Sequence, residues 1–185
     1  MRSLAIPIIA MVFVIVTSNI LVQYPINDWI TWGAFTYPAV FLVADLTNRI
    51  FGLRQARIVA IIGFPFGILL SVILSTEADL GLWTSIRIAL ASGFAFILAQ
   101  FLDIWIFDKL RKMTWWRAPF ISSTLASATD TTIFFSAAFA GSGLPWITWG
   151  LGDFGVKVGM AIIMLIPFKV FLALFATSVN QNTVR

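Results

Sequence analysis

Six apolar stretches, separated by turns whose charge alternates in sign, run along this chain from residue 3 to residue 178. Basic residues gather at the two chain ends and in every second turn: Arg2; Arg49, Arg54 and Arg57; Lys109, Arg111, Lys112 and Arg117; and Arg185. The other turns, residues 22–32, 75–83 and 141–153, contain no Lys or Arg and carry Asp28, Glu77, Asp79 and Asp153. Because membrane proteins keep basic loops in the cytoplasm, this alternation predicts six transmembrane helices with both termini inside.

Composition agrees with an all-α polytopic membrane protein. The chain is 60% hydrophobic and 11% charged, whereas soluble domains average roughly 45–50% and 25%. Six spans of about 20 residues leave only short loops in 185 residues, so residues 1–185 are expected to form one six-helix transmembrane domain. The basic residues lie beside helix ends, which favours the lipid bilayer as partner and gives no support to nucleic-acid binding.

The predicted spans are residues 3–22, 33–49, 56–75, 84–107, 117–140 and 153–178. The eight tryptophans provide an independent check, because each falls near a predicted span end and none falls at mid-bilayer. Tryptophan prefers the headgroup level, where its ring is buried and its N–H is hydrated.

Asp130 is the deepest ionisable side chain, 13 residues beyond Arg117. At about 1.5 Å per residue it lies about 20 Å along its helix, near the middle of a hydrocarbon core about 30 Å thick. A carboxylate at this depth is costly and usually faces a partner, a cavity or a substrate. Asp130 and its neighbour Thr131 are therefore candidate substrate-binding residues, with a purely structural Asp as the alternative.

Two further groups contain candidate binding residues. Lys157 is predicted one turn inside the outer end of the last span; it could bind substrate or simply pair with Asp153 at i,i+4. Asn19 and Gln23 lie toward the outer end of the first span and could line the same cavity. The second group lies nearer the cytoplasm and contains Asp45, Gln100 and Asp103.

Within this second group, Asp45 could form a local ion pair with Arg49, again at i,i+4. Asp103 has no basic neighbour on its own face of the helix, so it needs a partner from another helix.

Enzyme signatures are missing from the sequence. The chain has no Cys and no His, so a thiolate metal site, a disulfide and the commonest proton carrier are all excluded. No P-loop or zinc-protease motif occurs, and the residues 140–143, Ala-Gly-Ser-Gly, lack the general base that an intramembrane serine protease would need. The chain is therefore expected to be neither an enzyme nor a cofactor-binding protein.

Several strings in five of the six predicted spans resemble the VUT (vitamin uptake transporter) family, and specifically its bacterial queuosine-precursor transporter branch. These strings are residues 17–23, 31–38, 45–52, 99–103 and 123–125, with Asp130 and Thr131. The resemblance implies a six-helix protein of the cell inner membrane that imports 7-cyano-7-deazaguanine and 7-aminomethyl-7-deazaguanine for queuosine synthesis in tRNA. It also implies a fold similar to that of the substrate-binding components of energy-coupling-factor importers.

This substrate class fits the candidate residues. The N–H donors of a guanine-like edge can be accepted in pairs by a carboxylate such as Asp130 or Asp103. Phe134, Phe135, Phe35 and Tyr37 are candidates for stacking on the flat base, a contact worth about 1–3 kcal/mol. A substrate-binding subunit of a multi-component ATP-driven importer is the alternative to a stand-alone transporter. The oligomeric state stays open.

Overall fold

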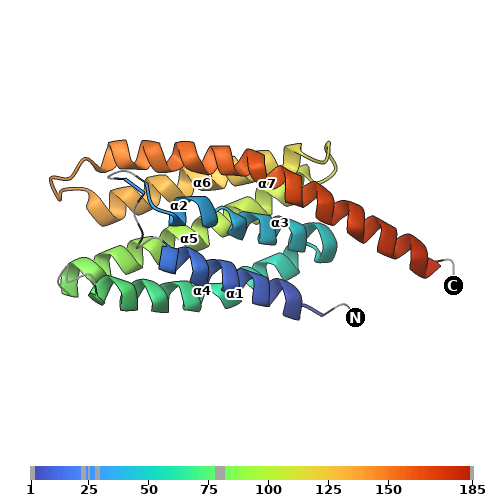
Figure 1. Cartoon of the computed structure of the whole chain (residues 1–185), viewed down its shortest axis with the longest axis horizontal. Helices are drawn as coiled ribbons and strands as arrows, with labels where there is room; N and C mark the ends of the chain where they lie inside the picture. The colour runs from blue at the N-terminus through green and yellow to red at the C-terminus, as the bar shows by residue number, and fades with distance from the viewer. Residues whose placement is uncertain (1–2, 22–23, 25, 28–29, 78–81, 184–185) are drawn as a thin grey trace.

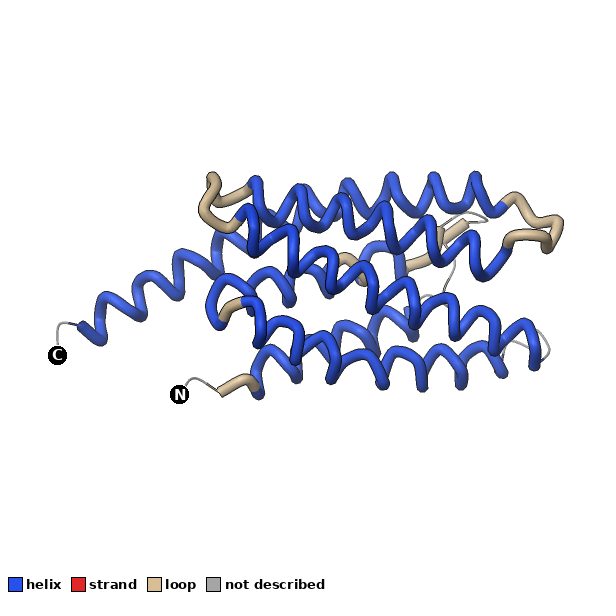
Figure 2. The backbone as a smooth tube through the Cα atoms, turned by 180° about the vertical axis from the view of Figure 1, so that it is seen from behind, coloured by secondary structure: helices blue, strands red, loops and turns tan. Residues whose placement is uncertain are grey.

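Helices laid side by side along one long axis make up this molecule (Figure 1). The computed structural model describes residues 3–21, 24, 26, 27, 30–77 and 82–183, and no strand occurs in this part of the chain (Figure 2). Its helices are α1 (Ala5–Leu21), α2 (Gly33–Thr36), α3 (Ala39–Phe51), α4 (Leu53–Glu77), α5 (Leu82–Leu110), α6 (Arg117–Phe139) and α7 (Trp146–Thr183). The all-α prediction is confirmed for these residues, and α1, α4, α5 and α6 match their predicted spans to within three residues at each end.

The prediction of one continuous helix over residues 33–49 is wrong. The chain forms the single turn α2, passes through Tyr37 and Pro38, and begins again as α3. Pro38 has no backbone N–H to donate to the preceding turn, and the Val40 N–H bonds instead to the Tyr37 carbonyl, 3.0 Å away. The α3 helix ends at Gly52, whose φ of 92° suits glycine far better than other residues.

The last helix begins earlier than predicted. It starts at Trp146 rather than at residue 153 and continues past Pro167, and its C-terminal part leaves the bundle (Figure 1). Lys157 therefore lies eleven residues beyond the start of α7, or about 16 Å at about 1.5 Å per residue. Its predicted position one turn inside the outer helix end is wrong.

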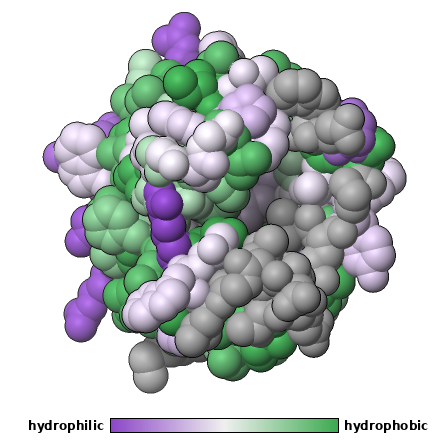
Figure 3. All heavy atoms as spheres, turned by 90° about the vertical axis from the view of Figure 1, so that its left-hand side faces the viewer, coloured by the Kyte–Doolittle hydropathy of each residue, from purple (hydrophilic) through white to green (hydrophobic). Residues whose placement is uncertain are grey.

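The polarity of this bundle is reversed relative to a soluble protein. Large apolar side chains on α1, α4, α5 and α7 are exposed, including Ile9 (66%), Leu69 (59%), Leu90 (63%) and Ile166 (68%). The described interior instead holds Asp45, Asn48, Gln100, Asp103, Ser122, Asp130 and Lys157, all 5% exposed or less. The end of the molecule seen in Figure 3 is mixed, with apolar and hydrophilic side chains next to one another. An exposed apolar surface of this extent marks contact with another apolar phase, as expected of a membrane protein.

Three helices in the described part of the chain are long and apolar enough to cross a membrane, over Leu53–Leu70, Ile86–Leu110 and Trp146–Leu174. The α1 and α3 helices have only 17 and 13 residues, and α6 carries many Ser and Thr residues together with Asp130. The structure thus supports a membrane protein by composition and length at three of the six predicted spans.

The apolar core joins α1, α3, α4 and α5. Met11, Ile15, Val40 and Ala60 are among its fully buried or nearly buried members. A Cβ atom added to Gly63 would lie 2.8 Å from atoms of both Met11 and Ile15, so α1 and α4 approach closely at this glycine.

The two turns that were predicted to be basic lie at one end of the molecule. Both termini, the α3–α4 junction and the α5–α6 turn lie at the same end (Figure 1). Side chains join two of these segments, because Arg49 donates a hydrogen bond to the Arg111 carbonyl and Arg111 donates one to the Arg49 carbonyl. The turns predicted to be basic are therefore neighbours in space.

Candidate functional site

A buried ammonium group links α7 to α6. Lys157 is 5% exposed, and its Nζ lies 2.8 Å from Oδ2 of Asp130 and 2.5 Å from Oδ2 of Asp153. The same Nζ donates to Oγ1 of Thr131 at 3.2 Å, and Thr131 in turn donates to Asp153 at 2.7 Å. We call these four residues, with Tyr37, the lysine network.

Tyr37 connects the lysine network to the break between α2 and α3. Its hydroxyl donates to Oδ1 of Asp130 at 3.3 Å, and its ring centroid lies 5.3 Å from Nζ of Lys157. A cation over an aromatic face is attracted by the electrons of the ring. The interruption at Pro38 therefore holds an aromatic ring against the buried ammonium group.

The lysine network contains two carboxylates and one ammonium group. Removing one partner from a buried ion pair typically costs about 3–5 kcal/mol, so this arrangement holds α6 and α7 together as well as offering polar groups to a ligand. The predicted pair between Lys157 and Asp153 is confirmed, and a second pair with Asp130 forms beside it.

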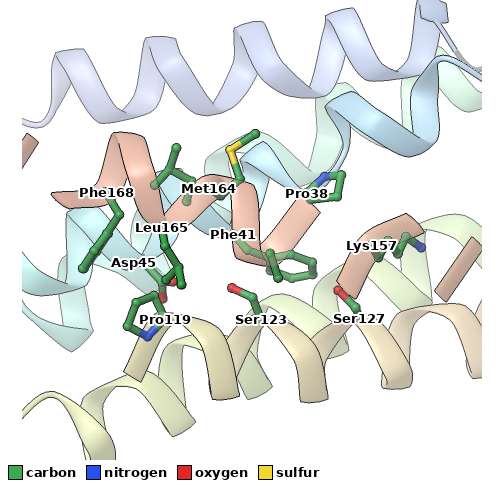
Figure 4. A pocket seen from close by; sticks show the side chains of 12 residues that line it. Pro38, Phe41, Asp45, Pro119, Ser123, Ser127, Lys157, Met164, Leu165 and Phe168 are labelled. Atoms are coloured by element: carbon green, nitrogen blue, oxygen red, sulfur yellow. The ribbon is translucent and has the colours of Figure 1, made fainter. Parts of the chain in front are cut away.

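A narrow cavity runs from Lys157 along the seam between α3, α6 and α7 (Figure 4). Phe41, Ala161, Met164, Leu165 and Phe168 supply much of its apolar wall. The hydroxyl-bearing side chains of Ser123 and Ser127 lie along it, and Asp45 lies toward its other end (Figure 4). Its volume of about 10 Å³ is room for about one water molecule.

A second polar cluster lies beyond that far end. Asp45 on α3 and Asp103 on α5 are 1% and 0% exposed, and their carboxyl groups lie within hydrogen-bonding reach of each other. Ser122 on α6 donates to Oδ1 of Asp45 at 3.4 Å. We call Asp45 and Asp103 the aspartate pair.

The proposed ion pair between Asp45 and Arg49 does not form, because Arg49 turns to the Arg111 carbonyl. Asp103 does receive a neighbour from another helix, as its isolation on α5 predicted, but that neighbour is acidic.

The predicted binding residues thus fall into two groups and four single positions, one of which, Gln23, lies outside the described residues. Asp130, Thr131 and Lys157 meet in the lysine network, while Asp45 and Asp103 meet in the aspartate pair. Gln100, 1% exposed, lies three residues before Asp103 on α5.

Phe134 packs edge-on against Phe135 and Phe139, with ring centroids 5.1 and 5.9 Å away. Asn19 donates to the Ile15 carbonyl of its own helix, and Gln23 lies outside the described residues.

Two features of the site went beyond the sequence-based expectation. Tyr37 was a candidate for stacking, and its hydroxyl also bonds to Asp130. The aspartate pair could be predicted only in part: Asp45 and Asp103 are both carboxylates in predicted spans, but their proximity could not be predicted.

Comparison with known proteins gives the chain a family. The model of a family described as "Putative vitamin uptake transporter" matches residues 31–172. The chain belongs to this family of transporters. Its matched segment includes every residue of the lysine network and of the aspartate pair.

Three individual relatives of the chain also carry transporter names. The chain is 37% identical over 191 residues to the "Probable queuosine precursor transporter" of Haemophilus influenzae, covering 84% of this chain and 80% of the relative. It is 36% identical over 174 residues to the "Queuosine precursor transporter" of Escherichia coli K12, covering 83% and 79%. A relative in Bacillus subtilis named "Probable queuosine precursor transporter" is 26% identical over 73% of this chain and 68% of the relative. No solved structure gives a significant match.

Proposed function

We propose that this protein imports queuosine precursors, the bases 7-cyano-7-deazaguanine and 7-aminomethyl-7-deazaguanine, across the inner membrane. The names of two relatives at 36% and 37% identity support this substrate class. The observation that carries the proposal within this chain is the buried contact of 2.8 Å between Lys157 and Asp130 at one end of a cavity.

These two groups complement the edge of a guanine-like base. Such an edge presents the O6 acceptor beside N–H donors, and a lysine donates to O6 while a carboxylate accepts from amino groups. Asp130 and Lys157 offer both functions side by side. A base that inserted between them would replace the direct ion pair with hydrogen bonds to each partner.

The cavity has to widen before a base can bind. At about 10 Å³ it admits about one water molecule, and a fused two-ring base is several times larger. Its walls come from α3, α6 and α7, so substrate entry requires α7 to separate from α3 and α6. In the described structure the cavity is therefore too small to hold a base.

We extend this proposal to the arrangement in the membrane. All six predicted spans cross the bilayer, both termini face the cytoplasm, and the acidic turns lie outside. The basic residues of the two cytoplasmic turns support this orientation, since Arg49 and Arg111 meet at the end of the bundle that also holds both termini (Figure 1).

A stand-alone transporter is favoured over a subunit of an ATP-driven importer. Small residues four apart could dock a separate scaffold, and the chain has such pairs at Ala56/Ala60 and Ala91/Ala95. All four are 5% exposed or less within the bundle, so they are occupied by internal packing.

Uptake by the chain alone tests this function. The protein is produced in a host that lacks its own importer, and cells are given labelled 7-cyano-7-deazaguanine. We expect uptake above the vector control, and loss of that uptake in Asp130→Asn but not in Asp108→Asn, whose carboxylate is partly exposed and pairs with Arg111. Absence of uptake with the protein present in the membrane would refute the proposal. Uptake only with an added ATPase scaffold would support the subunit alternative.

A further inference from the structure

The aspartate pair is enclosed by polar groups from three helices. Asp45 comes from α3 and Asp103 from α5, and the hydroxyls of Ser122 and Ser123 on α6 lie within hydrogen-bonding reach of Asp45. All four side chains are 8% exposed or less. Two carboxyl groups this close cannot both be ionised without strong repulsion, which is why such pairs share a proton.

No cation among the described residues neutralises this pair. Arg49, one turn along α3, is held by the Arg111 carbonyl, and Lys169 on α7 lies over the ring of Trp115 at 5.1 Å. Lys157 is held by Asp130 and Asp153 in the lysine network. The α1 helix has no ionisable side chain, and Arg54 and Arg57 of α4 are exposed.

Unsatisfied polar atoms point to a bound ligand. Among the described residues neither carboxylate oxygen of Asp103 makes a hydrogen bond of good geometry, although the Ser122 and Ser123 hydroxyls lie near it, and neither amide atom of Gln100 has a partner. Gln100 and Asp103 are three residues apart, on the same face of α5, and are 1% and 0% exposed. A buried carboxylate without donors is very costly, and a proton is the smallest species that removes this cost.

We propose that Asp45 and Asp103 form a proton-binding site and that the proton taken up there is coupled to substrate import. This inference rests on the proposed function. One proton enters from the outer side, is shared by the two carboxyl groups while substrate is carried, and is released to the cytoplasm. Asp45 also lines the cavity that ends at Lys157 (Figure 4), so its charge is felt along the substrate path.

Proteoliposomes loaded at alkaline pH and diluted into acidic buffer test the coupling. Each pH unit is worth about 1.4 kcal/mol, so one-to-one coupling supports about tenfold accumulation of labelled 7-cyano-7-deazaguanine per unit. We expect accumulation with the pH gradient and none with a sodium gradient alone. Asp45→Asn and Asp103→Asn should each abolish the accumulation that the pH gradient drives.

Asp108→Asn is the matched control, because it removes a carboxylate from the same helix, α5, at a partly exposed position. It should accumulate substrate like the wild type. Exchange of labelled for unlabelled base by the wild type without any response to the pH gradient, accumulation driven by sodium, or wild-type accumulation in both aspartate variants would overturn the proton site and leave the proposed function standing.

Infrared difference spectroscopy of the protein in lipid tests proton binding without any substrate. Titration should change a carbonyl band of protonated carboxylic acid that is missing in Asp45→Asn or Asp103→Asn and present in Asp108→Asn. A titration with no such band in the wild type would refute the proton site, even if the variants fail to fold. Absence of deazaguanine exchange in the wild type would instead refute the proposed function.

Discussion

Lys157 is a buried cation that lines the cavity. It balances one of two carboxylates, because Asp130 and Asp153 both lie within 2.8 Å of its Nζ. The two expected substrates differ in charge, since the nitrile is neutral and the aminomethyl group is a cation. A like charge at about 6 Å costs roughly 2–3 kcal/mol at an effective dielectric constant of about 20, so Lys157 opposes the aminomethyl base.

We therefore predict that Lys157→Gln shifts preference toward 7-aminomethyl-7-deazaguanine by more than tenfold, since about 1.4 kcal/mol corresponds to tenfold. The measurement is competition of each unlabelled base against uptake of the labelled cyano base. The Lys157→Gln variant leaves two carboxylates without their cation. The double variant Lys157→Gln, Asp153→Asn is therefore measured as well, because it has the same net charge in the lysine network as the wild type. An equal loss of both substrates in folded protein would show that Lys157 acts on the fold or on gating.

At the scale of helices, α1 and α4 approach closely at Gly63. We predict that Gly63→Leu destabilises the protein by about 1–3 kcal/mol, the usual cost of overpacking a filled core. Its added side chain would collide with Met11 and Ile15, whereas nothing lies within 4 Å of a Cβ at Gly159 on α7. Gly159→Leu is therefore the matched control, and thermal unfolding of both purified variants is the measurement. Equal melting temperatures would mean that α1 does not pack on Gly63 as described.

Most helices could be predicted from the sequence, because apolar length and turn composition set their ends. Two boundaries could not. A proline at position 38 is compatible with a bent helix or with two separate helices. The structure has two helices, and Tyr37 between them donates a hydrogen bond to Asp130. The start of α7 was set at Asp153 by its charge, yet seven preceding residues join the helix, and Gly150 packs against Phe135 of α6.

The middle position of Asp130 in its helix could be read from the sequence, and the side chain is buried there, but its partners could not be predicted. Which side chain meets Asp130 depends on the rotation of each helix about its own axis, and spacing along one helix says nothing about that rotation. For the same reason Asp45 and Arg49 suggested a local pair, while the fold turned Asp45 toward α5 and α6.

For the molecule as a whole, many large apolar side chains face outward, and several ionisable side chains are buried inside. Four buried ionisable side chains come from four different helices: Asp45 from α3, Asp103 from α5, Asp130 from α6 and Lys157 from α7. Each is 5% exposed or less. Buried ionisable groups are expensive in a membrane and usually mark a substrate or ion path. We propose on this basis that the interior binds a deazaguanine base through Asp130.

Equilibrium binding of labelled 7-cyano-7-deazaguanine to the purified protein in lipid nanodiscs tests that claim most directly. A hydrogen bond to a charged group contributes about 1.5–3 kcal/mol, so Asp130→Asn should weaken binding by about 10- to 100-fold. The fold should survive, because Lys157 keeps Asp153 at 2.5 Å, and Asp108→Asn should bind like the wild type. Equal affinity of folded Asp130→Asn and wild type, or no binding by the wild type, would contradict the account.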